Sequence, residues 1–223
     1  MGDVFENYDI IGAFWVTIQL SALGAVGALV IGTIVAVMRV SPVQVLRILG
    51  AAYVNVFRNT PLTLLMFFSI AGMAFILGLM VSDDLSANAY RWAVIALAVY
   101  HAGFVAEALR SGVNTIPAGQ AEAARSIGLT FGQSMREVLL PQAFRGSIAP
   151  LGSTLIALIK NTTVAAVILG TSNPEAAGML QVVTENEGAS LPTFGLFAIG
   201  FVILTLPLGV LFTRLSQHLA VKR

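Results

Sequence analysis

Long apolar stretches alternate with short polar segments along the 223 residues of this chain. An α-helix needs about 20 mostly apolar residues to cross the hydrocarbon core of a bilayer. Five stretches approach that length, at about 14–38, 61–81, 92–109, 148–169 and 194–215. Proline and glycine lie in or beside several of them, and membrane helices tolerate both residue types. The pattern predicts an all-α membrane protein with five transmembrane helices in a single transmembrane domain over residues 1–223.

Composition agrees with this prediction. Only 10% of the residues are charged, whereas a soluble domain has roughly 25%, so most of the surface is expected to face lipid. The absence of cysteine excludes disulfides, cysteine metal sites and thiol nucleophiles. The first residues include Asp3 and Glu6 but no lysine or arginine, unlike the basic start of a cleaved signal peptide. We therefore expect the first span to remain in the mature protein.

The charged residues separate by sign between alternate loops. Lysine and arginine favour the cytoplasmic side of a membrane protein. The loops after the first and third spans and the C-terminal tail hold Arg39, Arg47, Arg58, Arg110, Arg125, Arg136, Arg145, Arg214, Lys222 and Arg223. The remaining loops are acidic and contain one basic residue, Arg91. This separation predicts an outside N-terminus, a cytoplasmic C-terminus and a cytoplasmic loop, at about 116–141, between the third and fourth helices.

This cytoplasmic loop is polar but carries signals for two short helices. Pro117 suits the first turn of a helix, and Gly128 suits the left-handed residue that closes one. Thr130 and Gln133 have the spacing of a capping box, which would start the second helix. Pro141 marks the expected break after it. From these residues alone, the loop is either a rigid corner that docks a partner or an interfacial hairpin that merely connects two spans.

Residues 122–141 of the loop read EAARSIGLTFGQSMREVLLP. Glu-Ala-Ala is followed after three residues by Gly128, and the segment closes with Val138, Leu140 and Pro141. This spacing resembles the EAA loop of bacterial ABC importer permeases, in which isoleucine stands where this chain has Val138. The resemblance implies a coupling helix that docks a separate ATPase, with two small alanines entering a groove on the partner. The docking residues that it implies are Glu122, Ala123, Ala124, Arg125, Gly128, Leu140 and Pro141.

Three further segments resemble the permease subfamily for polar amino acids, the histidine, glutamine and glutamate type. They lie at 57–62, 106–110 and 158–163, and the resemblance covers nearly the whole chain. It implies the permease subunit of an ATP-driven importer in the bacterial cell membrane, with glutamate or glutamine as the transported amino acid. The substrate-binding residues that it suggests are Lys160, Asn161, Thr162, Arg58 and Glu107.

Some of these residues also have an interpretation that needs no substrate. Lys160 lies about mid-helix, where a buried cation is costly unless it is paired. It would meet a substrate carboxylate, pair with Glu107 or extend toward the membrane interface. Glu107 and Arg110 are three residues apart on one predicted helix, which favours a local ion pair.

The other candidate residues also have interpretations other than substrate binding. Arg58 fits a cytoplasmic anchor beside the second span better than a direct substrate ligand. Thr162 can donate a hydrogen bond to a carbonyl of its own helix. Asn161 stands where the subfamily often has aspartate, which changes the charge of the site. His101 is a lone histidine in an apolar helix and is expected to be packed and hydrogen-bonded.

The sequence lacks the motifs that would let this chain power transport. It contains no G-x-x-x-x-G-K-[ST] loop, and its only lysines are Lys160 and Lys222. We expect no catalytic residue, no metal site and no cofactor in this chain, and no nucleic-acid partner. The resemblance implies a partner ATPase dimer that binds ATP and Mg, a second permease, identical or related, and an extracytoplasmic amino-acid-binding protein. The alternative is a secondary transporter or channel that works in the bilayer without an ATPase.

Overall fold

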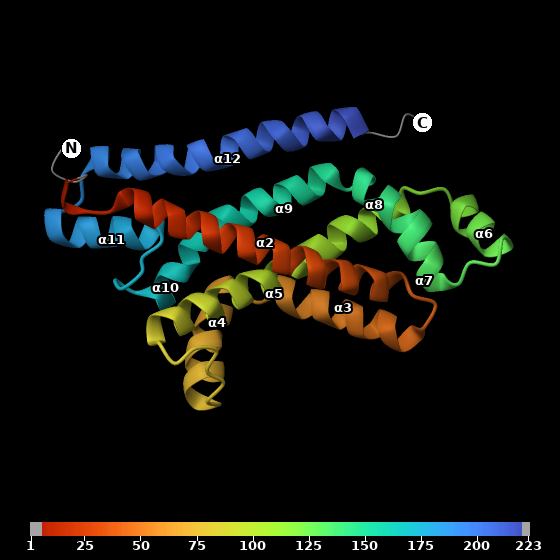
Figure 1. Cartoon of the computed structure of the whole chain (residues 1–223), viewed down its shortest axis with the longest axis horizontal. Helices are drawn as coiled ribbons and strands as arrows, with labels where there is room; N and C mark the ends of the chain where they lie inside the picture. The colour runs from red at the N-terminus through yellow and green to blue at the C-terminus, as the bar shows by residue number, and fades with distance from the viewer. Residues whose placement is uncertain (1–5, 220–223) are drawn as a thin grey trace.

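A computed structural model describes residues 6–219, and every regular element in that part of the chain is helical (Figure 1). Four helical segments there are long and apolar enough to cross a membrane, and a bent helix pair brings the number to five if it counts as one span. The all-α prediction is therefore confirmed, and the predicted five spans agree with the higher of these two numbers. Two of the five expected spans differ from the structure in their bounds.

The centre of the fold is a close pair of long helices, α2 (Ile10–Val40) and α5 (Leu85–Asn114). Gly24, Ala28 and Gly32 recur every fourth residue on the buried face of α2. A β-carbon added at Gly32 would lie 2.6 Å from the β-carbon of Val105. Small residues at this spacing let two helix backbones approach closely, which is the usual basis of helix packing in membranes.

The helix α5 is longer than the sequence predicts. The expected third span, 92–109, is the shortest of the five, but α5 has 30 residues. The side chain of Asp84 caps its N-terminus by accepting a hydrogen bond from the backbone N–H of Ala87 at 2.6 Å. The side chain of Asn88 accepts a second one from the backbone N–H of Val81 at 2.8 Å. Because these polar groups are paired, the helix begins at Leu85, in a segment too polar to be predicted as part of the span.

The second span also differs from its prediction at 61–81. The structure has α3 (Gln44–Asn59), then α4 (Leu62–Phe67), which continues as the π-helix η1 (Phe68–Ile76). The two halves are bent by 102°. Pro61 causes the break, since proline lacks an N–H and disfavours helical backbone at the residue before it. Thr60 is accordingly extended, with φ −89° and ψ 132°.

The helix α3 packs against both α2 and α5 instead of forming part of a connecting loop. Its C-terminal end, with Arg58, lies beside Gly103 in the interior of α5. The expected placement of residues 44–59 in a loop is therefore wrong. Arg58 lies in the last turn of α3, packed on α5, whereas the sequence pattern indicated an anchor in a loop.

The remaining spans follow the prediction more closely. The fourth span, Ile148–Leu169, consists of α9 (Ile148–Asn161), a 3-10 turn η3 (Thr162–Ala165) and α10 (Ala166–Leu169). The last span is α12 (Leu191–Leu219), which contains Pro207 and packs mainly on α9. Only 6% of its most apolar window is buried, so most of this helix faces lipid or another subunit.

A short helix, α11 (Ala176–Glu187), connects the fourth and fifth spans. Its N-cap is Glu175, a fully buried residue whose carboxylate accepts hydrogen bonds from the backbone N–H groups of Ala177 and Gly178, each at 2.8 Å. The backbone N–H of Ala176 donates to the hydroxyl of Thr17 on α2 at 3.0 Å. Burial raises the pKa of Glu175, and the two backbone N–H groups oppose that shift.

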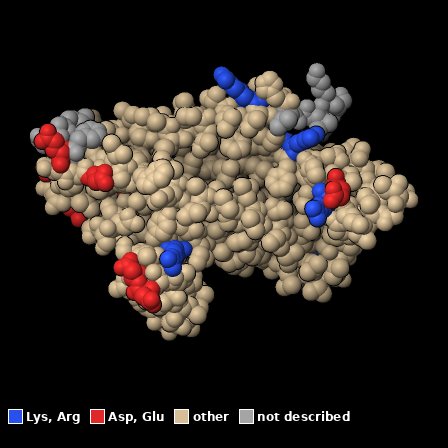
Figure 2. All heavy atoms as spheres, viewed as in Figure 1, with Lys and Arg blue, Asp and Glu red and all other residues tan. Residues whose placement is uncertain are grey.

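The loop between α5 and α9 forms the opposite end of the molecule (Figure 1). It contains α6 (Ala118–Ser126), α7 (Phe131–Gln133), the π-helix η2 (Ser134–Leu139) and α8 (Leu140–Gly146). On the face drawn in Figure 2, most acidic side chains gather toward the end that carries α11 and most basic ones toward the end that carries α6 and α8. The middle of this face is largely uncharged, as expected for a surface that faces lipid.

Candidate functional site

The α6–α7 corner is built by local signals that are visible in the sequence. Gly128 follows α6 with φ 84°, the left-handed conformation that closes a helix. The hydroxyl of Thr130 accepts a hydrogen bond from the backbone N–H of Gln133, and the side chain of Gln133 accepts one from the backbone N–H of Thr130 at 2.8 Å. The predicted capping box and the predicted glycine corner are both confirmed.

The expected docking residues on α6 differ in whether their side chains are exposed or buried. Glu122, Ala123 and Arg125 are exposed, whereas Ala124 is only 3% exposed and packs inward on the chain. Ala124 is therefore covered by this chain itself, and the entry of the two alanines into a partner groove stays a prediction. The exposed apolar residue at the tip is Ile127, with 77% of its surface accessible. Ile127 is not among the residues predicted from the sequence, although an apolar side chain directly before the corner glycine is a visible signal.

Pro141 does not break the second helix of the loop. The helix widens into the π-turns of η2 and continues into α8, where Pro141 lies in the first turn and is exposed. Proline cannot donate the usual hydrogen bond and clashes with the carbonyl one turn before it, and a π-turn is a known way to accommodate such an interruption. Leu140 beside it is half-buried.

The loop is tied directly to the central helix pair. The hydroxyl of Ser147, after α8, donates a 2.8 Å hydrogen bond to the carbonyl of Ala108 on α5. Gly112 of α5 meets α8 so closely that an added β-carbon would lie 2.4 Å from the carbonyl oxygen of Ala143. The loop therefore packs tightly against α5.

A second group of polar residues lies along α5, on which both α3 and α9 pack. The guanidinium of Arg58 lies over the ring of Phe104 at 5.1 Å, and its aliphatic stem packs across Gly103. This is a cation–π contact, which a partly dehydrated guanidinium favours. Arg58 remains exposed on the outer side of the contact. The arginine is thus held at a defined position beside α5 and stays accessible to a ligand.

His101 and Asn161 join α5 to α9 in the same region. His101 is 1% exposed, its Nδ1 lies 2.9 Å from the carbonyl oxygen of Leu97, and its Nε2 lies 3.1 Å from Nδ2 of Asn161. The expectation of a packed, hydrogen-bonded histidine is confirmed. Tyr100 packs edge-on against the imidazole at 5.0 Å between ring centroids. The contact between His101 and Asn161 was not predicted, because no pattern in the sequence links the two residues.

The two residues that flank Asn161 differ in exposure. Thr162 is buried, and its hydroxyl donates to the carbonyl of Ile159 at 2.7 Å, which confirms the expected bond to its own helix. Lys160 is exposed and forms no ion pair with any residue in the range 6–219. The ammonium group of Lys160 therefore has no acidic partner in the described part of the chain, whereas Thr162 supports the turn.

Glu107 belongs to a separate ionic cluster. It pairs with Arg39 of α2 and, at 3.1 Å, with Arg110 on its own helix. The expected local pair with Arg110 is confirmed, and Glu107 does not form the alternative pair with Lys160. Because two arginines hold its carboxylate, Glu107 stabilises the junction of α2 and α5 and does not offer a free negative charge to the Arg58 region.

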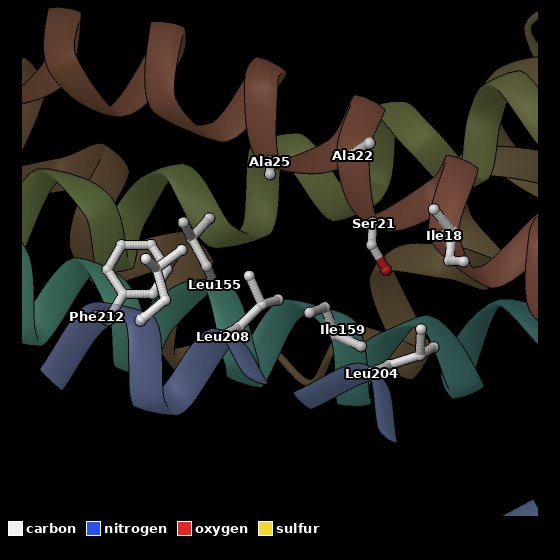
Figure 3. A pocket seen from close by; sticks show the side chains of 10 residues that line it. Ile18, Ser21, Ala22, Ala25, Leu155, Ile159, Leu204, Leu208 and Phe212 are labelled. Atoms are coloured by element: carbon white, nitrogen blue, oxygen red, sulfur yellow. The ribbon is translucent and has the colours of Figure 1, made fainter. Parts of the chain in front are cut away.

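The cavity between α2, α9 and α12 is a different feature. It has a volume of about 400 Å³, and Figure 3 shows its walls of aliphatic and aromatic side chains, among them Ile18, Leu155 and Phe212. Ser21 supplies the hydroxyl seen in that view, and it already donates to the carbonyl of Thr17 at 2.7 Å. A polar, charged ligand would find no charged partner there, so the Arg58 region is the better candidate for a substrate site.

The architecture is that of a permease subunit: spanning helices, an apolar belt and an exposed helical corner at one end. The chain belongs to the family of binding-protein-dependent transport system inner membrane components, whose model matches residues 28–222. It is therefore a multi-pass membrane component of an ABC importer, and it is not an enzyme.

Individual relatives show which kinds of permease the chain is similar to. The chain is 50% identical over 221 residues to the glutamate transport system permease protein GluC of Corynebacterium glutamicum, with 96% of each chain covered. It is 33% identical to the probable glutamine ABC transporter permease protein GlnM of Bacillus subtilis, covering 97% of this chain and 96% of that one. Among solved structures, an amino acid ABC transporter with histidines aligns with a TM-score of 0.78, 24% identity and coverage of 94% and 93%. This last likeness concerns the fold.

Proposed function

We propose that the chain is the permease of an importer for acidic amino acids, with L-glutamate as its substrate. The observation that carries this is the charge of the residues that border α5. Arg58 is exposed and lies over Phe104 of α5. Lys160 is exposed and precedes Asn161, which contacts His101 on the same helix. The acidic residue of α5, Glu107, is paired with two arginines. Two cations without a free carboxylate favour a ligand that carries two carboxylates. The 50% identity to a glutamate permease supports the same substrate.

The proposal includes the orientation and the partners. The N-terminus lies outside and the C-terminus in the cytoplasm, because basic residues dominate the α6–α8 end of the chain. The α6 corner then acts as the coupling helix for an ATPase dimer, which binds ATP and Mg. An extracytoplasmic binding protein delivers the amino acid, and a second permease, identical or related, completes the path.

In this proposal, α5 connects the cytoplasmic loop to the residues that bind the substrate. The accessible residues of the corner, together with Ile127, contact the ATPase, and Gly128 holds the corner. Movement of the corner passes through Ser147 and Ala108 to α5. The helix α5 also carries His101 and Phe104, so closure of the ATPase dimer changes the environment of Asn161 and of Arg58. Coupling of this kind needs a physical connection between the two sites.

The test is uptake by the complete importer in proteoliposomes. ATP enclosed with the ATPase should drive uptake of radiolabelled L-glutamate when the binding protein is present, and omission of the ATPase should abolish it. Arg58→Gln should lower glutamate uptake about tenfold, because a hydrogen bond to a charged partner is worth roughly 1.5–3 kcal/mol. Arg47→Gln is the matched control, since Arg47 lies on the same helix but bonds to the carbonyls of Ser41 and Pro42. Equal uptake by Arg58→Gln and the parent, or preferential uptake of L-arginine, would overturn the proposal.

Orientation is tested separately with reporter fusions. A reporter that is active only in the cytoplasm should work when fused after Arg223 and should be silent when inserted at Asp83. The reverse pattern would overturn the proposed orientation while leaving the substrate proposal standing.

A further inference from the structure

The buried histidine of α5 has a defined role in the geometry of the substrate region. His101 touches the carbonyl of Leu97 through Nδ1 and the side-chain amide of Asn161 through Nε2. Residues 101 and 161 come from different spans, so this bond is tertiary and fixes one side chain against the other. Among the residues that the structure describes, no carboxylate contacts the imidazole.

The carbonyl of Leu97 decides where the ring proton is. A carbonyl oxygen can only accept a hydrogen bond, so Nδ1 at 2.9 Å must carry the hydrogen. A buried ring without a carboxylate partner is held in its neutral form, because an unpaired buried charge is costly. A neutral imidazole has one donor and one acceptor, so Nε2 is then an acceptor. The backbone of α5 thus fixes the tautomer of His101.

The tautomer in turn fixes the orientation of Asn161. An accepting Nε2 requires a donor opposite it, and only the NH₂ group of the amide can donate. Nδ2 of Asn161 therefore faces His101 at 3.1 Å, and Oδ1 faces away. Oδ1 accepts no hydrogen bond from residues 6–219 and is not among their buried unpaired atoms, so it stays accessible on the partly exposed side of Asn161.

We propose that His101 is a positioning residue that makes Asn161 present its carbonyl oxygen to the α-ammonium group of the substrate. This role rests on the proposed function. Arg58 and Lys160 attract the carboxylates of an acidic amino acid, but neither can accept a hydrogen bond from its ammonium group. The oriented Oδ1 of Asn161 supplies that acceptor without adding a negative charge. Without His101 the amide could turn, and its NH₂ group would then oppose the ammonium group.

Two ligands isolate this contact. L-Glutamate and glutarate carry the same two carboxylates, but glutarate lacks the amino group. Binding of each is measured by calorimetry on the purified complex of permeases and ATPases in nanodiscs, without the binding protein. The parent complex should prefer glutamate over glutarate about tenfold, the value of one charge-assisted hydrogen bond.

The variants separate orientation from packing. His101→Phe keeps a ring but removes both hydrogen bonds, so the preference for glutamate should fall to about twofold or less, with glutarate affinity nearly unchanged. His101→Gln places a carbonyl that can accept from Asn161, so it should retain most of the preference. Asn161→Ala should lose the preference to the same extent, and the double variant with His101→Phe should lose no more, as expected for one shared contact.

The ring itself is checked by nitrogen-15 NMR of the complex with labelled histidine. The chain has two histidines, and His218→Gln removes the signal of the other one from this subunit. A neutral ring protonated at Nδ1 is expected for His101. A ring protonated at Nε2 would overturn the proposal, as would equal losses of glutamate and glutarate affinity in His101→Phe. A parent complex that binds neither ligand while its ring is protonated at Nδ1 would instead refute the proposed acidic substrate, and the assigned role of Asn161 with it.

Discussion

Gly128→Ala tests the docking corner with a single added methyl group. The backbone of Gly128 has φ 84°, and a β-carbon added there would meet nothing within 4 Å. The cost of the change is therefore conformational and not steric. Left-handed backbone costs a residue with a β-carbon about 1–2 kcal/mol, which lowers the equilibrium constant for forming the corner about 5- to 30-fold.

The matched control lies four residues further along the same loop. A β-carbon added to Gly132 would also meet nothing within 4 Å, but Gly132 lies inside α7 and has no positive φ. Gly132→Ala should therefore keep the corner, and it should favour the helix by up to about 1 kcal/mol. The two variants add the same methyl group to the same loop, so only the conformation of the backbone distinguishes them.

The assay is a titration of the ATPase onto the permease in nanodiscs. If the ATPase recognises the folded corner, the apparent dissociation constant rises by the factor by which that corner is depopulated. We expect an increase of up to about 30-fold for Gly128→Ala and none for Gly132→Ala. Equal affinities of the two variants would refute the reasoning, because they would show that the left-handed corner is not what the ATPase binds.

Three other tests address separate parts of the structure. Lys160→Met should lower glutamate uptake about tenfold in proteoliposomes, and Lys160→Arg should lie between, because a planar guanidinium does not replace a compact ammonium; parental uptake would make Lys160 structural. Gly32→Ala should destabilise the detergent-solubilised protein by about 1–3 kcal/mol through overpacking against Val105, whereas Gly195→Ala, with nothing within 4 Å, should not. Glu175 has a raised pKa, so its proton stabilises the folded state and that stability is lost as pH rises from the ordinary carboxyl pKa through the raised one; Glu175→Gln should flatten the change of melting temperature over that pH range.

Local features of the chain were predictable because neighbouring residues determine them. Gly128 and the capping box of Thr130 and Gln133 depend on a few positions in sequence, and the structure has both. The first, fourth and fifth spans were predictable for a related reason, since their apolar stretches are long enough to be recognised without tertiary information.

Other features depend on tertiary contacts and were not predictable from the sequence. The helix α3 carries Arg47, Asn55 and Arg58, so its hydropathy resembles that of a loop, and only packing on α2 and α5 brings it into the body of the fold. Ala123 and Ala124 are identical neighbours in sequence, and only the packing of α6 on η2 decides which one is buried. The bond between His101 and Asn161 joins two spans that share no pattern in sequence.

The break at Pro61 has a consequence for how the protein enters the membrane. The helix α3 has 16 residues, about 24 Å at 1.5 Å per residue, which is less than the hydrocarbon thickness of about 30 Å. The segment after the break, Leu62–Ile76, is no longer. Neither half can cross the bilayer alone. At the break, the backbone N–H and C=O groups without helical partners need protein or water around them. During synthesis, we therefore expect α2 to insert first and the two halves to wait beside it until α5 emerges from the ribosome, so that biogenesis depends on the same glycine-rich contact that holds the finished fold together.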